Sequence, residues 1–154
     1  MRLAILFSGQ GQQTPEHLSF LRENSGRDVS QELAKVLGGV WNESGEQSTD
    51  LSTNRIAQPL IFGFEMAWWE KLMSYLPTPV CAAGYSLGEM AACSAAGLFT
   101  DKAGIALCHE RASLMDSNTP YPVGMLAVLG ISEDKVLAMA TQHGLAIAIR
   151  NSPT

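Results

Sequence analysis

The sequence has 154 residues, 46% of them hydrophobic and 16% charged, which is the balance of a globular domain with a core of its own. The formal net charge is −5 and no basic run occurs, so the composition argues against a nucleic-acid-binding protein. The apolar stretch 56–76 contains three charged residues, which makes it a poor membrane span. The three cysteines lack metal-binding or redox spacing, and they suit a reducing cytoplasm.

The first half of the chain predicts one strand and two helices. The apolar run "RLAILFS" predicts a buried strand, followed by the glycine-rich loop "GQGQQ". The segment "SQELAKVLGG" predicts a short amphipathic helix, and the polar stretch 41–54 predicts a surface loop. A second helix over 58–76 is expected to begin with Pro59 in its first turn. Its apolar residues fall on nearly all sides, so we expect it to be buried, with Trp68 and Trp69 in the core.

A serine between two glycines then follows a short apolar run. The segment "PTPVCAA" predicts a buried strand, and the segment after "GYSLGE" predicts a helix of small residues that stops near Gly97. Ser86 at such a strand-to-helix turn, with Gly84 and Gly88 two residues away on either side, is the pattern of a nucleophile elbow. The glycines allow a sharp turn and a close approach of neighbouring backbones. A glycine-rich turn in which the serine merely caps a helix is the alternative.

The segment "TDKAGIALCHERASLMDS" predicts a further helix, capped by Thr100 or Asp101. Its spacing suggests an inward-facing stripe that consists of Ala103, Leu107, Leu114 and Met115. Arg111 falls on the same stripe, because it lies four residues after Leu107 and three before Leu114. A buried arginine needs a carboxylate, so the spacing alone favours a salt bridge or a side chain that extends to solvent.

After "NTPYPVG" the pattern of apolar residues changes. The runs "MLAVLGI" and "LAIAIRN" predict two strands, and "SEDKVLAMATQHG" predicts a helix between them from Ser132 to Gly144. This β-α-β unit looks like the start of a smaller second lobe. We therefore divide the chain into a main lobe over 1–122 and the beginning of a second lobe over 123–154.

The loop after the first strand suits the elbow. A tetrahedral intermediate needs two N–H groups to hold its oxyanion. Leu87, directly after Ser86, would supply one, and Gln10 in the loop after the first strand is well placed to supply the other. The loop lacks the Gly-Lys-Ser/Thr of a phosphate-binding P-loop, and Thr14 stands where a dinucleotide-binding loop has its third glycine.

Four pieces of the sequence stand in a characteristic order: "FSGQGQQ", "AQPLIF", "GYSLGEMAA" and "HERASLM". With "GMLAVLG" and "RNSP" after them, the chain resembles the malonyl-CoA:acyl-carrier-protein acyltransferase family from its first strand to its last residue. Within that family, its sequence is most similar to the acyltransferase subunits of malonate decarboxylase. The resemblance implies an α/β fold: an α/β-hydrolase-like lobe with a short parallel sheet, into which a small ferredoxin-like lobe is inserted.

The resemblance also implies a reaction, which is a ping-pong malonyl transfer of the kind used in fatty acid biosynthesis. Ser86 would attack the thioester of malonyl-CoA, and the malonyl-serine ester would pass to the thiol of an acyl carrier protein. Gln10 and Leu87 would form the oxyanion hole, and Arg111 would bind the malonyl carboxylate. No bound cofactor or metal is implied. Besides the carrier protein, other malonate decarboxylase subunits are the partners that the subgroup implies.

Two residues have lesser implied roles, and two features depart from the family. Gln58 and Asn151 match positions near the family's active site. Tyr85 replaces the histidine that usually precedes the nucleophile, as it tends to do in the malonate decarboxylase subunits. The catalytic histidine of the family lies beyond the second lobe, and His17, His109 and His143 match no such motif. The chain therefore resembles the N-terminal half of an acyltransferase, and we expect it to be inactive alone.

Two other functional classes remain open. A serine hydrolase or thioesterase could use the same elbow, although Arg111 favours a carboxylated acyl group over a plain fatty ester. A non-catalytic binding module is the third possibility, because no catalytic base is recognised in the sequence.

Overall fold

The computed structural model describes residues 2–11, 13–42, 50–119 and 123–152. The chain forms two compact units, residues 1–120 and residues 121–154. Half of the predicted surface loop over 41–54, residues 43–49, lies outside the described residues. Within the described ranges, the helices are too short or too polar to span a lipid bilayer.

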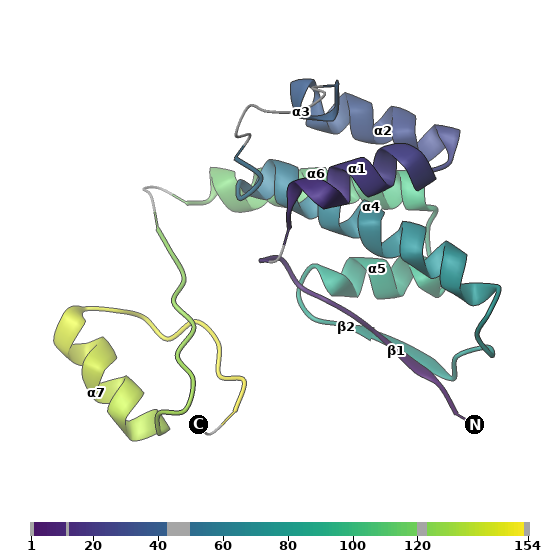
Figure 1. Cartoon of the computed structure of the whole chain (residues 1–154). Helices are drawn as coiled ribbons and strands as arrows, with labels where there is room; N and C mark the ends of the chain where they lie inside the picture. Colours follow the sequence, from purple (N-terminus) through teal and green to yellow (C-terminus); the bar gives the residue numbers. More distant parts are fainter. Residues whose placement is uncertain (1, 12, 43–49, 120–122, 153–154) are drawn as a thin grey trace. The chain divides into compact units, whose positions relative to one another are not determined.

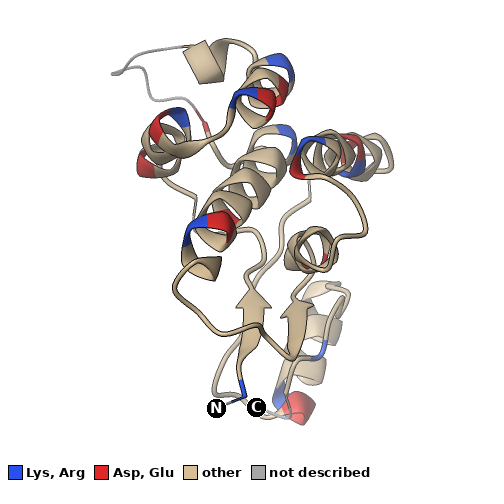
Figure 2. Ribbon diagram, turned by 90° about the vertical axis from the view of Figure 1, so that its right-hand side faces the viewer, with Lys and Arg blue, Asp and Glu red and all other residues tan. Residues whose placement is uncertain are grey.

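The sheet of the first unit is a parallel pair of strands, β1 (Ala4–Phe7) and β2 (Cys81–Gly84). Ala4 lies opposite Cys81 and Phe7 opposite Gly84. Figure 2 shows the two strands side by side, without a charged residue on either. Because parallel strands end at the same edge of a sheet, the loop after β1 and the "GYSLGE" turn after β2 are neighbours. The predicted α/β class with a short parallel sheet is thus confirmed.

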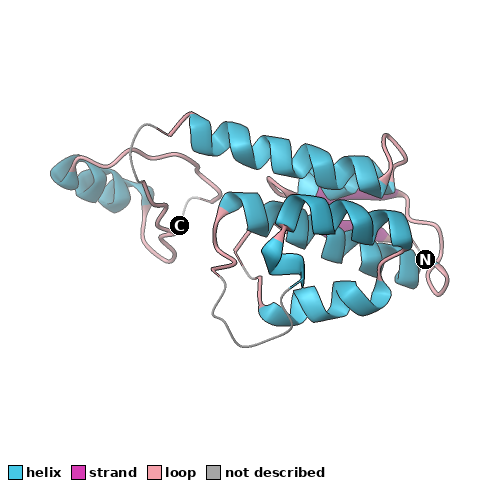
Figure 3. Ribbon diagram, turned by 90° about the horizontal axis from the view of Figure 1, so that it is seen from above, coloured by secondary structure: helices cyan, strands magenta, loops and turns pink. Residues whose placement is uncertain are grey.

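The helices of this unit are α1 (Pro15–Asn24), α2 (Arg27–Leu37), α3 (Gly39–Asn42), α4 (Asn54–Met73), α5 (Gly88–Ala95) and α6 (Asp101–Ser117). In Figure 1, α5 lies next to the strands, and α4 and α6 lie on the other side of α5. Helices α1 and α2 pack on the outer side of α4. Figure 3 shows α4 and α6 side by side. The arrangement places the strand ends, the start of α5 and the face of α6 around one region.

Helix α4 begins four residues before the predicted start, after Thr53. Pro59 therefore lies in the second turn rather than the first, which corrects the prediction. The helix is buried on most sides as expected, with Leu60 and Phe62 fully buried. Trp69 packs at the edge of the core, but Trp68 is 41% exposed and stacks on Phe20. The prediction that both tryptophans lie in the core is therefore wrong for Trp68.

The predicted end of α5 and the predicted cap of α6 are both confirmed. Gly97 has a φ of 80°, a left-handed conformation that ends α5 at little cost only for glycine. Thr100 caps α6, because its Oγ1 accepts a hydrogen bond from the N–H of Ala103 at 3.3 Å. Helix α1 has no counterpart among the predicted elements. It begins directly after its N-cap residue Thr14, whose N–H donates to Nδ1 of His17 at 3.0 Å.

The predicted inward stripe of α6 is wrong. Leu107, Leu114 and Met115 are 44%, 55% and 43% exposed. The buried face consists of Gly104, Ile105, Cys108 and Ala112. Small residues are buried because α4 approaches closely: a Cβ at Gly104 would lie 2.1 Å from Cζ of Phe62. Spacing identified one face of α6 correctly, but the large apolar side chains on that face point away from α4.

The second unit contains α7 (Glu133–His143), as predicted. Ser132 is its N-cap residue, and Gly144 ends it with a φ of 64°. Neither flanking run forms a strand within 123–152, so the predicted β-α-β unit is reduced to its helix. A strand is defined by hydrogen bonds to a neighbour, and the described residues offer these two apolar runs no ladder partner.

Candidate active site

Ser86 occupies a strained turn directly after β2. Its φ of 54° is the one positive value at a non-glycine position among the described residues. Such a conformation costs roughly 1–2 kcal/mol for an L-amino acid. Hydrogen bonds hold the turn on both sides: Tyr85 donates its N–H to the carbonyl of Phe7 at 3.2 Å, and Glu89 donates its N–H to the carbonyl of Ser86, also at 3.2 Å. The structure thus forms the sharp turn that the sequence pattern predicted.

The two glycines of the turn are required by close backbone contacts. A Cβ on Gly84 would lie 1.9 Å from the carbonyl carbon of Gly88. A Cβ on Gly88 would lie 2.4 Å from the carbonyl oxygen of Phe7 and 2.5 Å from that of Ser8. These distances are far below van der Waals contact, so only glycine permits α5 to start against the end of β1.

Arg111 reaches the candidate nucleophile. Its Nη2 donates a hydrogen bond to Oγ of Ser86 at 3.1 Å, and its Nη1 donates to Oε1 of Gln58 at 2.7 Å. Gln58 is fully buried in α4. Both side chains also contact Sδ of Met115 at 3.3 Å. Three residues that are remote in sequence, Gln58, Ser86 and Arg111, are thus joined in one cluster.

In the described part of the chain, no carboxylate oxygen lies within ion-pair distance of Arg111. The salt bridge that the spacing favoured is therefore not formed among those residues. A half-buried guanidinium held by a neutral amide, a hydroxyl and a thioether retains its affinity for an anion.

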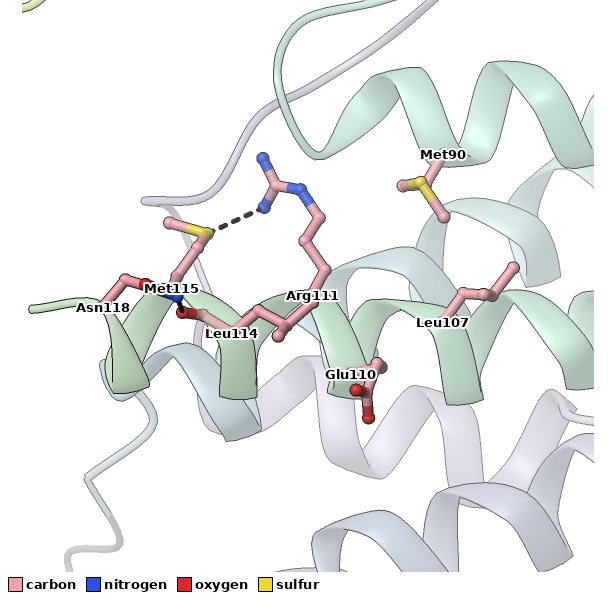
Figure 4. Close-up of a pocket in the computed structure, with 7 residues that line it drawn as sticks. All are labelled: Met90, Leu107, Glu110, Arg111, Leu114, Met115 and Asn118. Atoms are coloured by element: carbon pink, nitrogen blue, oxygen red, sulfur yellow. Dashed lines mark hydrogen bonds between the residues drawn. The ribbon is translucent and has the colours of Figure 1, made fainter.

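A pocket of about 600 Å³ lies beside the guanidinium. It is lined by Met90, Leu107, Glu110, Arg111, Leu114, Met115 and Asn118. In Figure 4, Met90 of α5 and Leu107 of α6 lie on one side of Arg111, and Met115 lies on the other side with its sulfur beside the guanidinium. Leu107, Leu114 and Met115 of α6 therefore form, with Met90 of α5, an apolar wall next to a cation. Such a wall suits a ligand that combines an acyl or alkyl part with an acid group.

The two candidate oxyanion donors lie on the loops that meet at the strand ends. Leu87 is the N-cap residue of α5, and within the described residues its N–H has no protein acceptor. The side chain of Gln10 donates to Oδ1 of Asn54 at 3.0 Å, and Asn54 donates to Asp116 at 2.7 Å. The loop of Gln10 is thus fixed to the start of α4 and to the end of α6.

Of the two remaining predicted site residues, Tyr85 lies beside the loop after β1, and Asn151 lies in the second unit. The ring of Tyr85 packs on the loop after β1, with its Cδ1 3.0 Å from the position of a Cβ at Gly9. Asn151 belongs to the second unit, and its role near the site stays a prediction.

None of the three histidines is bonded to Ser86 within the described residues. His17 binds Thr14 and packs on Phe64, His109 has a buried Nδ1 without a partner, and His143 ends α7 in the second unit.

Cys108 lies close to Arg111 but is no competing nucleophile. Burial raises the pKa of its thiol to about 12, although the nearby Arg111 charge acts in the opposite direction. The thiol therefore stays protonated near neutral pH, and a protonated thiol is a poor nucleophile.

Glu65 is a contributor that the sequence analysis missed. Its Oε1 accepts hydrogen bonds from the N–H of Ser8 at 2.6 Å and from the Oγ–H of Ser8 at 2.8 Å. Burial raises the pKa of Glu65 above its usual range, and the bonds from Ser8 oppose that shift. A carboxylate in the apolar helix "QPLIFGFEMAWW" was the available signal, because an acid in such a helix needs a partner.

The strained serine, the helix start beside it and the arginine that touches it together have the parts of a serine-dependent acyl-transfer site. The chain belongs to the acyl transferase domain family, whose model matches residues 6–154. A curated relative, the polyketide biosynthesis protein ThaF of Burkholderia thailandensis, is 30% identical over 98% of this chain and 13% of its own length.

Solved structures agree with the family assignment. A malonyl CoA-acyl carrier protein transacylase from Burkholderia pseudomallei matches with a TM-score of 0.76 and 27% identity, over 100% of this chain and 54% of that protein. A malonyl-transacylase solved in complex with a type II polyketide synthase acyl-carrier protein matches with a TM-score of 0.70 and 26% identity, over 92% and 48%. The chain thus spans about half the length of these transacylases, and the fold and family of the sequence analysis are confirmed.

Proposed function

We propose that the protein transfers a malonyl group from coenzyme A to the thiol of an acyl carrier protein through an ester on Ser86. The observation that carries this proposal is Arg111, a half-buried cation that touches the Ser86 hydroxyl and has no carboxylate partner in the described part of the chain. A malonyl thioester has its reactive carbonyl and its carboxylate separated by one carbon. Ser86 supplies a nucleophile, and the adjacent guanidinium of Arg111 can bind a carboxylate with two N–H groups, so the pair matches that spacing.

The first half-reaction would proceed at the elbow. Oγ of Ser86 attacks the thioester carbonyl, the C–S bond breaks, and the hydroxyl proton leaves with the sulfur of coenzyme A. The N–H groups of Leu87 and Gln10 would hold the oxyanion, and the amino end of α5 adds a favourable dipole there. The second half-reaction is the reverse chemistry, with the carrier thiol attacking the malonyl-serine ester.

Arg111 would change partners during this reaction. In the free protein its Nη2 is bonded to Oγ of Ser86, and its Nη1 to Gln58. A malonyl carboxylate would replace these neutral acceptors with a stronger, charged one. The hydroxyl of Ser86 would then be released from the guanidinium at the moment the substrate is in place.

An acyl carrier protein is the partner that this proposal requires, and the carrier-bound relative supports it. A contribution of Asn151 from the second unit, and of Tyr85 beside the acyl group, is part of the same proposal. The malonate decarboxylase subgroup, its subunits as partners and a cytoplasmic location stay predictions.

The experiment is to load the full-length protein, with the region that carries the family's catalytic histidine, with radiolabelled malonyl-CoA, remove the excess and add a carrier protein that bears its prosthetic thiol. Transfer of label from the protein to the carrier is the expected result. Release of the label as free malonate, at the same rate with and without carrier, would instead indicate a thioesterase. A protein that binds malonyl-CoA without becoming labelled would contradict both enzymatic proposals.

A further inference from the structure

The carboxylate of Glu65 holds one end of the loop that follows β1. Both donors of Ser8, the N–H and the hydroxyl, converge on the same oxygen, Oε1. The other oxygen, Oε2, is buried and has no hydrogen-bond partner in the described part of the chain. A carboxylate in an apolar helix is costly to bury, so this placement is compensated chiefly by the two bonds to Ser8.

The same loop segment is fixed on its other side by the elbow. The carbonyl oxygens of Phe7 and Ser8 lie against Gly88, where a Cβ would come within 2.4 Å and 2.5 Å of them. Gly9 packs on Tyr85, the residue before the nucleophile. The segment from Ser8 to Gln10 is thus held between a carboxylate of α4 and the turn that carries Ser86.

Gln10 is tied to the same helix at its other end. Its side chain donates to Asn54, the first residue of α4, at 3.0 Å. Asn54 and Glu65 lie eleven positions apart along α4, so the loop is attached to one rigid helix at two separated points. Main-chain atoms between two such attachments have little freedom to move relative to the elbow.

We infer that Glu65 is a positioning residue that fixes the main-chain N–H of Gln10 for the oxyanion through its hold on Ser8. This inference rests on the proposed acyl transfer, since it assigns to Gln10 the oxyanion role. Loss of an oxyanion donor lowers kcat about 10²–10³-fold, and a misplacement of about 1 Å costs on the order of 10²-fold. Glu65 touches no reacting atom, so its removal should act on kcat more than on KM.

The test uses a fluorophosphonate probe, which phosphonylates an activated serine and places its oxygen in the oxyanion hole. In the full-length protein, Glu65→Ala should slow the labelling of Ser86 about 10–100-fold. Glu65→Gln, which retains an acceptor oxygen for Ser8, should recover most of that loss. Glu70→Ala is the matched control, because Glu70 is an exposed acid on the same helix. Labelling of Glu65→Ala at the unaltered rate, or an equal loss in the alanine and glutamine variants, would overturn the inference.

A second variant and a steady-state measurement complete the test of Glu65. If Glu65→Ala does not fold, Ser8→Ala removes one of the two donors and should slow the labelling as well, and an unchanged rate in this variant would overturn the inference. Because the probe is not a thioester, a wild-type protein that reacts with the probe but not with malonyl-CoA would refute the proposed function while still testing Glu65. In steady-state transfer, the Glu65 variants should lower kcat with little change in KM for malonyl-CoA, and an effect confined to KM would count against a positioning role.

Discussion

The guanidinium of Arg111 donates a hydrogen bond to Oγ of Ser86 across 3.1 Å, although the two residues lie 25 positions apart in the sequence. This contact joins the elbow that follows β2 to the face of α6 that borders the apolar pocket. It places an anion-binding group within one hydrogen bond of the candidate nucleophile.

The first prediction concerns acyl selectivity. Arg111→Ala should lower the rate of malonyl transfer and raise the preference for acetyl-CoA, because only the malonyl group carries a carboxylate. A charge-assisted hydrogen bond contributes about 1.5–3 kcal/mol, or roughly ten- to a hundred-fold in rate. The measurement is kcat/KM for both thioesters. Arg27→Ala, a change of an exposed arginine on α2, is the control, and an equal loss on both substrates would indicate a purely structural arginine.

The second prediction concerns Gln58, which orients Arg111 from the buried side of α4. Gln58→Leu keeps the volume but removes the acceptor, so the guanidinium loses its anchor. We expect malonyl transfer to fall roughly ten-fold, and acetyl transfer to change less. Gln31→Leu, at an exposed position of α2, should leave both rates unaltered. Gln58→Leu with wild-type selectivity would show that Met115 and Ser86 suffice to hold Arg111.

The third prediction concerns the close approach of α5 to β1. Gly88→Ala introduces a methyl group 2.4 Å from the carbonyl oxygen of Phe7, which belongs to backbone and cannot rotate away. We expect the free energy of unfolding to fall by about 1–3 kcal/mol or more, and Ser86 to become unreactive. Gly26→Ala is the control, since nothing lies within 4 Å of a Cβ there. Urea denaturation of both variants checks this, and equal stabilities would refute the close contact.

The fourth prediction concerns pH and Glu65. Burial raises the pKa of this carboxyl above its ordinary value of 4.5. The folded protein therefore retains a proton over a range in which the unfolded chain has released it. The contribution of Glu65 to the free energy of unfolding should then decrease as the pH rises through 4.5 toward the raised pKa of the folded state, and level off above it.

Urea unfolding of the wild-type protein and of Glu65→Gln, at a series of pH values from about 4 to 7, isolates this contribution. The difference in stability, wild type minus variant, should decline over that interval. The neighbouring Cys108 does not interfere, because its pKa of about 12 keeps the thiol neutral over this range. A difference that increases with pH would mean that the bonds from Ser8 outweigh the burial.

Local signals in the sequence predicted the elbow well. The glycine at 84, which lies against Gly88, the cap at Thr100 and the stop at Gly144 each depend on backbone conformation or on a neighbour a few residues away. Such features are encoded locally, which is why residue type and spacing sufficed to predict them.

Contacts between distant segments could not be predicted in the same way. Spacing placed Arg111 with Leu107 and Leu114 but could not show that α4 would cover the opposite, small-residue face of α6. The bond between Glu65 and Ser8 spans 57 positions, and nothing in either local sequence specifies the other. The two apolar runs that flank α7 were predicted as strands from their composition, whereas a strand also needs a neighbour to pair with.

The central claim is that Ser86 carries the malonyl group, and mass spectrometry tests it most directly. Full-length protein is mixed with malonyl-CoA, quenched in acid and digested, and the peptide that contains Ser86 is examined for one added malonyl group. Ser86→Ala should abolish the adduct without unfolding the protein, because alanine fits the elbow as serine does. Ser117→Ala, at the exposed end of α6, should retain it. An adduct on another residue, or one of undiminished yield in Ser86→Ala, would contradict the account.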